Sequence, residues 1–118
     1  RDAVTLRADT DTLTLAPGES GAATFTLTVA DGYHVNANRV PRTDLVATVA
    51  MIATSAPAAI GAVRFPDATD YNDGAGETLS VYIGAGTLVL PVTVAADAAP
   101  GTYSATLTVR AQPCTDFE

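Results

Sequence analysis

The sequence contains no lysine and no tryptophan, and only one cysteine, one histidine and one methionine. Its six basic residues are arginines that form no patch, and the formal net charge is −7. Such a chain lacks the basic face that nucleic-acid phosphates require, and it lacks the positive charge that binds anionic membrane surfaces. A single cysteine excludes an internal disulfide framework and a zinc site.

Long hydrophobic runs are also missing, since no segment approaches the roughly 20 apolar residues of a membrane-spanning helix. The 118 residues are 47% hydrophobic and 16% charged, a balance typical of one globular domain covering residues 1–118. The chain begins with Arg1 and not with methionine. We therefore expect a piece excised from a larger exported protein whose signal has been removed.

Alternation of apolar residues with threonine is the dominant pattern, in AATFTLTVA, TLVLPVTV and TYSATLTVR. A period of two indicates strands with one buried face, and threonine suits the solvent face because its branched Cβ favours the extended backbone. The residues expected to face the core are Phe25, Leu27, Val29, Leu88, Leu90, Val92, Val94, Tyr103, Ala105, Leu107 and Val109.

Five further segments are predicted to be strands: Val4–Ala8, Thr12–Ala16, Leu45–Thr54, Ile60–Phe65 and Leu79–Ile83. The alanine-rich run 45–54 is assigned to a strand and not to a helix because it contains three β-branched residues and no capping box precedes it. Turn signals stand at Pro17-Gly18, Asp31-Gly32, Asn72-Asp73-Gly74, Gly84-Ala85-Gly86 and Pro100-Gly101. About eight or nine short strands separated by such turns predict an all-β, Ig-like antiparallel β-sandwich.

Several single residues receive structural interpretations. Met51 is expected in the core, and Tyr103 is expected to bond its hydroxyl to the backbone as a corner tyrosine. His34 lies on the opposite side of its predicted strand from Tyr33 and Val35 and is expected to be exposed. No serine, cysteine or carboxylate stands at a spacing from it that would indicate a hydrolytic site. The Gly84–Gly86 segment is interpreted as a hairpin turn, not a phosphate site, because no helix follows it.

Cys114 lies close to the end of the sequence, in RAQPCTDFE. The alternation of the last strand, carried forward, places it with Arg110 on the face away from the core. Pro113 removes a ladder hydrogen bond, so the strand should end or lie at an edge there. An accessible free thiol is a liability in an oxidising compartment, so a partner thiol is expected. The sequence contains no second cysteine to serve as that partner.

Four segments occur together in one order: GYHVNAN (32–38), LSVYIG (79–84), LPVTVAADAAPGTY (90–103) and TVRAQPC (108–114). They resemble the N-terminal periplasmic domains of thiol:disulfide interchange proteins, the disulfide bond corrector family of Ig-like sandwiches. The likeness extends from about Thr12 onward, with Ala111 and Pro113 departing from the family's residues beside the cysteine. Cys114 matches the first redox cysteine, and the resemblance implies a second one directly after Glu118, so that the chain would be cut inside a CxxxxC motif.

The resemblance implies thiol–disulfide exchange without a metal, an organic cofactor or a small-molecule substrate. Electrons would come from an inner-membrane domain of the same parent protein and pass to periplasmic thioredoxin-fold isomerases or cytochrome-maturation proteins. The parent would then be a protein-disulfide reductase, whereas this piece with Cys114 alone would be inactive. The isolated domain is expected to be a monomer, with a Cys114-linked dimer as the alternative.

The resemblance also implies a cap over the thiol. The longest irregular segment, 67–77, precedes the strand where the family carries its cap loop, so Asp67, Asp70 and Tyr71 would form it, with Tyr71 as the shielding aromatic residue. The alternative is a solvated acidic loop, while the pattern of a calcium loop is absent. Residues matching positions near the cysteines are Tyr33, Asn36 and Tyr82, although tyrosines in a sandwich also serve as core residues with the hydroxyl at the rim.

Two functional classes therefore compete. The first is a redox-relay module that exchanges disulfides through Cys114. The second is a non-catalytic Ig-like structural or interaction domain of a secreted or cell-surface protein, because fold alone does not determine function. A third hypothesis is a truncated homologue that still binds a thioredoxin-fold partner but no longer catalyses disulfide exchange. A downstream cysteine and membrane segment would favour the first class, and further β domains would favour the second.

Overall fold

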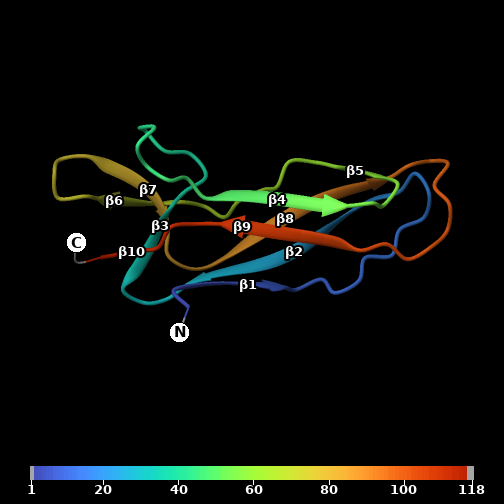
Figure 1. The fold of residues 1–118 in the computed structure, drawn as a ribbon, viewed down its shortest axis with the longest axis horizontal. Coiled ribbons are helices and arrows are strands. Elements are labelled where there is room, and N and C mark those ends of the chain that lie inside the picture. Colours follow the sequence, from blue (N-terminus) through green and yellow to red (C-terminus); the bar gives the residue numbers. More distant parts are fainter. Residues whose placement is uncertain (1, 117–118) are drawn as a thin grey trace.

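The protein is built from three antiparallel sheets, as a computed structural model that describes residues 2–116 shows (Figure 1). The ten strands of the described residues are β1 (Val4–Ala8), β2 (Ser20–Val29), β3 (Tyr33–Asn36), β4 (Val49–Thr54), β5 (Ala58–Ile60), β6 (Thr69–Asn72), β7 (Thr78–Tyr82), β8 (Gly84–Val94), β9 (Ala105–Arg110) and β10 (Cys114–Thr115). Their orders are β1-β2-β8-β5, β10-β3-β7-β6 and β4-β9. The expected all-β antiparallel sandwich is confirmed.

The longest pairing joins β2 to β8, from Ser20 opposite Thr93 to Val29 opposite Gly84. Alternation decides which residues of these strands are buried: Leu27, Val29, Leu88 and Leu90 are at most 3% exposed, as the period of two predicted. Each such side chain contributes about 1.5–3 kcal/mol when it is removed from water. This ribbon forms the long axis of the molecule, and β9 lies over it (Figure 1).

Two sharp changes of direction carry the chain between the sheets. After β2, the Asp31-Gly32 turn is closed by the Tyr33 amide, which donates to the Ala30 carbonyl at 3.1 Å, and Gly32 has a φ of +83°. Between β7 and β8 only Ile83 intervenes, and Gly84 has a φ of +62°. Glycine is needed at both positions because side chains disfavour this left-handed region.

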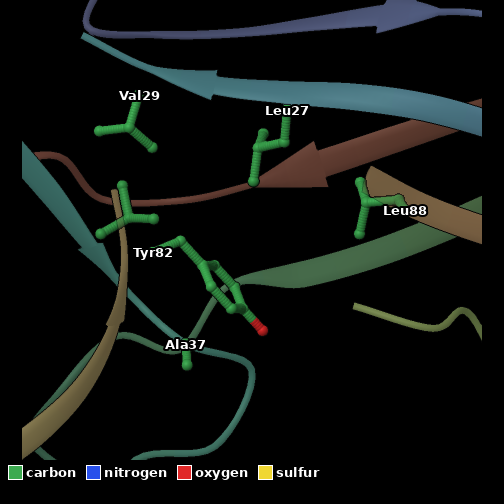
Figure 2. Packing of buried hydrophobic residues seen from close by; sticks show 6 residues of the cluster. Leu27, Val29, Ala37, Tyr82 and Leu88 are labelled. Atoms are coloured by element: carbon green, nitrogen blue, oxygen red, sulfur yellow. The ribbon is translucent and has the colours of Figure 1, made fainter. Parts of the chain in front are cut away.

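The core gathers where these crossings bring the sheets together. Leu27, Val29 and Leu88 pack with Val35 and Tyr82 of the other four-stranded sheet. Figure 2 shows the ring of Tyr82 extending among these side chains, with Ala37 beside it. Partly buried residues of the two-stranded sheet and its neighbours pack against the same cluster, among them Leu107, Val109 and Phe65.

Three predicted elements differ from the structure. Residues 12–16 form no strand: Leu15 packs over Gly21, where an added Cβ would lie 2.9 Å from a Leu15 methyl, and the segment has no neighbouring strand to pair with. Residues 67–77 are not irregular throughout, since β6 pairs with β7 as a hairpin. The expected turn at 84–86 is strand, because all three residues pair with β2.

The predictions for the strands at 45–54 and 60–65 were partly wrong. The run 45–54 forms a strand only from Val49, because Val46 and Thr48 are held by hydrogen bonds with Asn36. Likewise, strand pairing in the 60–65 region is confined to β5, which ends at Ile60, and one bridge at Arg64.

Three residues expected to be buried are exposed. Met51 is 44% exposed, because β4 turns its alternate residues Ala50 and Ile52 inward. Tyr103 and Ala105 are also exposed. Tyr103 precedes β9, and Ala105 is the first residue of that strand. The Tyr103 hydroxyl donates to the Ala99 carbonyl at 3.1 Å, so the corner role is confirmed.

Replacing Leu88 with alanine should destabilise the protein by about 2–5 kcal/mol, because a fully buried side chain leaves a cavity between the sheets. Met51→Ala is the matched control on the outer face of β4 and should change stability by less than about 1 kcal/mol. Urea unfolding followed by circular dichroism measures both. Equal effects of the two variants would contradict the location of the core.

Candidate functional site

Cys114 begins β10, a two-residue strand at the edge of the sheet that contains β3. The chain leaves β9 after Arg110 and joins this second sheet through Ala111–Pro113, so the alternation of β9 does not continue to the cysteine. In the new register Cys114 lies opposite His34, and Thr115 lies opposite Tyr33. The thiol, expected to be accessible, is half-buried, and its Sγ lies 3.8 Å from the Gln112 carbonyl oxygen.

The strand register determines which side chains share the face of Cys114. Directly opposite residues share a face, and so do alternate residues of one strand. Cys114 lies opposite His34, and His34 and Asn36 are alternate residues of β3. Asn36 lies opposite Val81 of β7, whose alternate residue Leu79 lies opposite Tyr71. Cys114, His34, Asn36 and Tyr71 therefore lie on one face of the four-stranded sheet.

The remaining candidates lie elsewhere. Tyr33 alternates with Val35, which lies opposite Tyr82, and Ser80 lies opposite Asp70. Tyr33, Tyr82 and Asp70 therefore share the opposite face, where Tyr82 joins the core and Asp70 is exposed. Asp67 is exposed and precedes β6. Of the residues assigned to the cap, the structure brings only Tyr71 into contact with the segment that carries the thiol.

Tyr71 makes that contact in two ways. Its ring stacks on the imidazole of His34, with centroids 4.2 Å apart and planes inclined by 29°. Its hydroxyl donates to the backbone carbonyl of Asp116 at 3.3 Å. The aromatic residue of the β6–β7 hairpin thus binds the chain just beyond Cys114.

The hairpin itself is held by short-range polar contacts. Asn72 and Asp73 accept hydrogen bonds from the amides of Gly74 and Ala75 at 2.9 and 2.8 Å, an arrangement that favours a tight turn. Arg42 Nη1 lies 3.1 Å from Glu77 Oε1, an ion pair without hydrogen-bond alignment. The acidic residues of this loop are thus partly committed to shaping it.

His34 is 5% exposed, which corrects the expectation that it faces solvent. The alternation rule assumes that one face of a strand meets water, but β3 is covered on both faces. Tyr71 covers the ring of His34, and Asp116 accepts a hydrogen bond from its Nδ1 at 2.8 Å. Sequence reasoning missed the role of both His34 and Asp116, and the only available signal was that His34 is the sole histidine.

Asn36 and Tyr82 hold the surrounding backbone. The Asn36 amide donates to the Val46 carbonyl at 3.1 Å, and Thr48 donates its hydroxyl to the Asn36 carbonyl at 2.6 Å. The Tyr82 hydroxyl donates to Asn38 Oδ1 at 2.8 Å and accepts from the Asn38 amide at 3.2 Å. These bonds fasten residues 38–48 to β3 and β7.

The arrangement offers one nucleophile, the Cys114 thiol, opposite His34, whose imidazole stacks on the ring of Tyr71. Among residues 2–116, no group of three or more histidine, cysteine or acidic side chains is placed to hold a metal ion. In the same part of the chain, no helix is long and apolar enough to cross a membrane. The chemistry open to such a thiol is nucleophilic attack on another sulfur.

Burial raises the pKa of Tyr82 above its ordinary value, although the hydrogen bond from the Asn38 amide opposes this effect. The unfolded chain ionises its tyrosines near pH 10, before the folded Tyr82 does. The stabilisation is therefore fully present below about pH 10 and is lost as the pH rises toward the folded pKa. Tyr82→Phe should show a shallower loss of stability between about pH 9 and 11, measured by urea unfolding. An unchanged slope would contradict this assignment.

A comparison with protein-family models places this geometry among known proteins. The model described as "Thiol:disulfide interchange protein DsbD, N-terminal" matches residues 3–117. A comparison with curated proteins found no match. Domains of the matching family are extracytoplasmic and serve thiol–disulfide exchange with other proteins. Because the match covers nearly the whole sequence, the chain belongs to the family of N-terminal domains of the thiol:disulfide interchange protein DsbD.

Proposed function

We propose that this chain is a single redox-relay domain that exchanges disulfides through Cys114. It would carry electrons from an inner-membrane reductase domain of its own parent protein to periplasmic thioredoxin-fold proteins, including those of cytochrome maturation. The observation that carries the proposal is the placement of a half-buried thiol at a sheet edge, with the Tyr71 hydroxyl bound two residues further along the chain.

The proposed reaction needs two thiols. The Cys114 thiolate attacks one sulfur of a partner disulfide, the partner's sulfur–sulfur bond breaks, and the leaving thiolate takes up a proton. A second cysteine, which we place just after Glu118, then attacks the mixed disulfide and releases the partner with both of its thiols reduced. The two electrons come from the pair of cysteines, which ends as a disulfide that the membrane domain reduces again. No metal or organic cofactor takes part.

We further propose that the β6–β7 hairpin is the cap of this site. Tyr71 supplies the shield, while Asp67 and Asp70, both exposed, flank it as polar surface that a partner meets on approach. The roles of the three near-site residues follow from their faces. Tyr33 supports the pairing of β10 with β3, and the hydrogen bonds of Asn36 and Tyr82 keep β3 and β7 in place.

The 118-residue chain should form a lasting mixed disulfide with a thioredoxin-fold protein that keeps only one active-site cysteine and is supplied as the disulfide of that cysteine with a small aromatic thiol, which leaves as the new bond forms. It contains only Cys114, so no second thiol is present to resolve the bond. Intact-mass spectrometry and non-reducing electrophoresis measure the adduct, and Cys114→Ser is the control that should form none. A chain extended through the second cysteine should instead release the reduced partner.

Failure of the folded protein to form this adduct, while its thiol still reacts with a small alkylating reagent, would reject the exchange function. The non-catalytic interaction module would then be the better description. A residue other than cysteine just after Glu118 in the parent protein would reject the two-thiol reaction.

Tyr71→Ala should increase the rate of Cys114 alkylation on the order of tenfold, because it removes both an aromatic stack and a hydrogen bond, each worth about 1 kcal/mol. Tyr103→Ala is the matched control. Its hydroxyl also bonds a backbone carbonyl, but it lies in the loop before β9, at the far end of the molecule from β10 (Figure 1). Equal rates for Tyr71→Ala and the unmodified chain would reject the cap.

A further inference from the structure

The segment that carries Cys114 has little backbone pairing of its own. Between residues 111 and 116, Cys114 and Thr115 alone pair with β3, and the Asp116 amide donates to the Gly32 carbonyl at 2.9 Å. A two-residue strand at the edge of a sheet frays readily unless other contacts hold it. Those contacts come from side chains, and they converge on one residue.

That residue is His34. Its Nδ1 lies 2.8 Å from Asp116 Oδ1, and because a carboxylate oxygen accepts, Nδ1 carries the proton. One face of its ring stacks on Tyr71. It lies opposite Cys114 in the register, which brings the two Cβ atoms within about 4.5–5.5 Å.

Contacts among His34, Tyr71 and Asp116 link three elements in a closed triangle. His34 comes from β3, Tyr71 from β6 and Asp116 from the chain that follows β10. The third side of the triangle is the hydrogen bond from the Tyr71 hydroxyl to the Asp116 carbonyl. Movement of Tyr71 therefore removes a contact from both the imidazole and the thiol segment.

Burial strengthens this connection. The His34 side chain is 6% exposed, whereas that of Asp116 is 38% exposed. A buried imidazole that lost Asp116 would keep a polar nitrogen without a partner, and such a loss is costly in a water-poor environment. The hydrogen bond thus favours the closed position of the segment over an open one.

We infer that His34 is the positioning residue that couples the cap to the thiol. Its Nδ1 holds Asp116, its ring holds Tyr71, and opening of the β6–β7 hairpin and exposure of Cys114 are consequently one event. The inference rests on the proposed function in taking Cys114 as the reacting thiol. It adds a positioning residue to that function, because displacement of Tyr71 removes a contact from His34 and loosens the segment that carries the sulfur.

Two substitutions separate the two contacts of His34. His34→Phe keeps a ring for Tyr71 and loses the bond to Asp116. His34→Asn places an amide nitrogen near the position of Nδ1, keeps that bond and loses the ring. Each is combined with Asp116→Ala, which removes the acceptor from a largely accessible position.

The measured quantity is the rate of Cys114 alkylation by iodoacetamide in the folded 118-residue chain. His34→Phe and Asp116→Ala should each raise it roughly tenfold, the effect of losing one hydrogen bond to a charged group. The double variant should react no faster than either single one, because both changes remove the same interaction. Asp116→Ala should still raise the rate in the His34→Asn background.

A general loss of stability is separated from this coupling by Leu88→Ala, which destabilises the core without touching the triangle. Its alkylation rate should stay below that of His34→Phe when the two variants are compared at equal free energy of unfolding. A rate that follows stability alone, or effects of His34→Phe and Asp116→Ala that multiply, would overturn the coupling.

Nuclear magnetic resonance supplies an independent signal because His34 is the only histidine. Its ring resonances should shift when Cys114 is alkylated and when Tyr71 is replaced by alanine, and should stay in place in Tyr103→Ala. Unchanged ring resonances after alkylation would also overturn the inference. If mixed disulfides form but alkylation ignores the His34 variants, the coupling alone fails; if alkylation responds but no mixed disulfide forms, the exchange function alone fails.

Discussion

The pairing of β10 with β3 is the constraint on which the candidate site depends. It takes the chain out of the two-stranded sheet, attaches it to the edge of a different sheet and sets Cys114 opposite His34. Without this change of sheet the cysteine would continue the outer face of β9, far from the β6–β7 hairpin. The pairing of these two residues thus decides that the segment carrying the thiol lies beside His34 and contacts Tyr71 through Asp116.

The fold distributes its stability unequally along its length. The central ribbon of β2 and β8 pairs continuously from Ser20 to Val29 and buries the leucines of the core. The edge that carries Cys114 is held by a short ladder and by the contacts of His34, Tyr71 and Asp116. Regions with few backbone hydrogen bonds open locally at low free-energy cost. Under the proposed function, this location lets the Cys114 segment open while the central ribbon stays paired.

Much of the fold and part of the site could be predicted from particular residues. The alternation around Leu27 and Leu88 predicted the main strands. Tyr71 contacts the chain beyond the cysteine, and its role as a shield stays a prediction. His34 and Met51 were placed wrongly for one reason. Alternation reports that two faces differ, but it does not report which face a second layer covers, so a buried histidine and an exposed methionine look alike in sequence.

The sequence by itself determined the main alternating strands, the Asp31-Gly32 turn and the single thiol, because these depend on local backbone preferences and on residue identity. Only the tertiary structure decided that residues 111–113 change sheet, that Tyr71 and not Asp70 shares the face of Cys114, and that His34 joins Tyr71 to Asp116. Those outcomes depend on register between strands distant in sequence, and a shift of one residue would reverse every face.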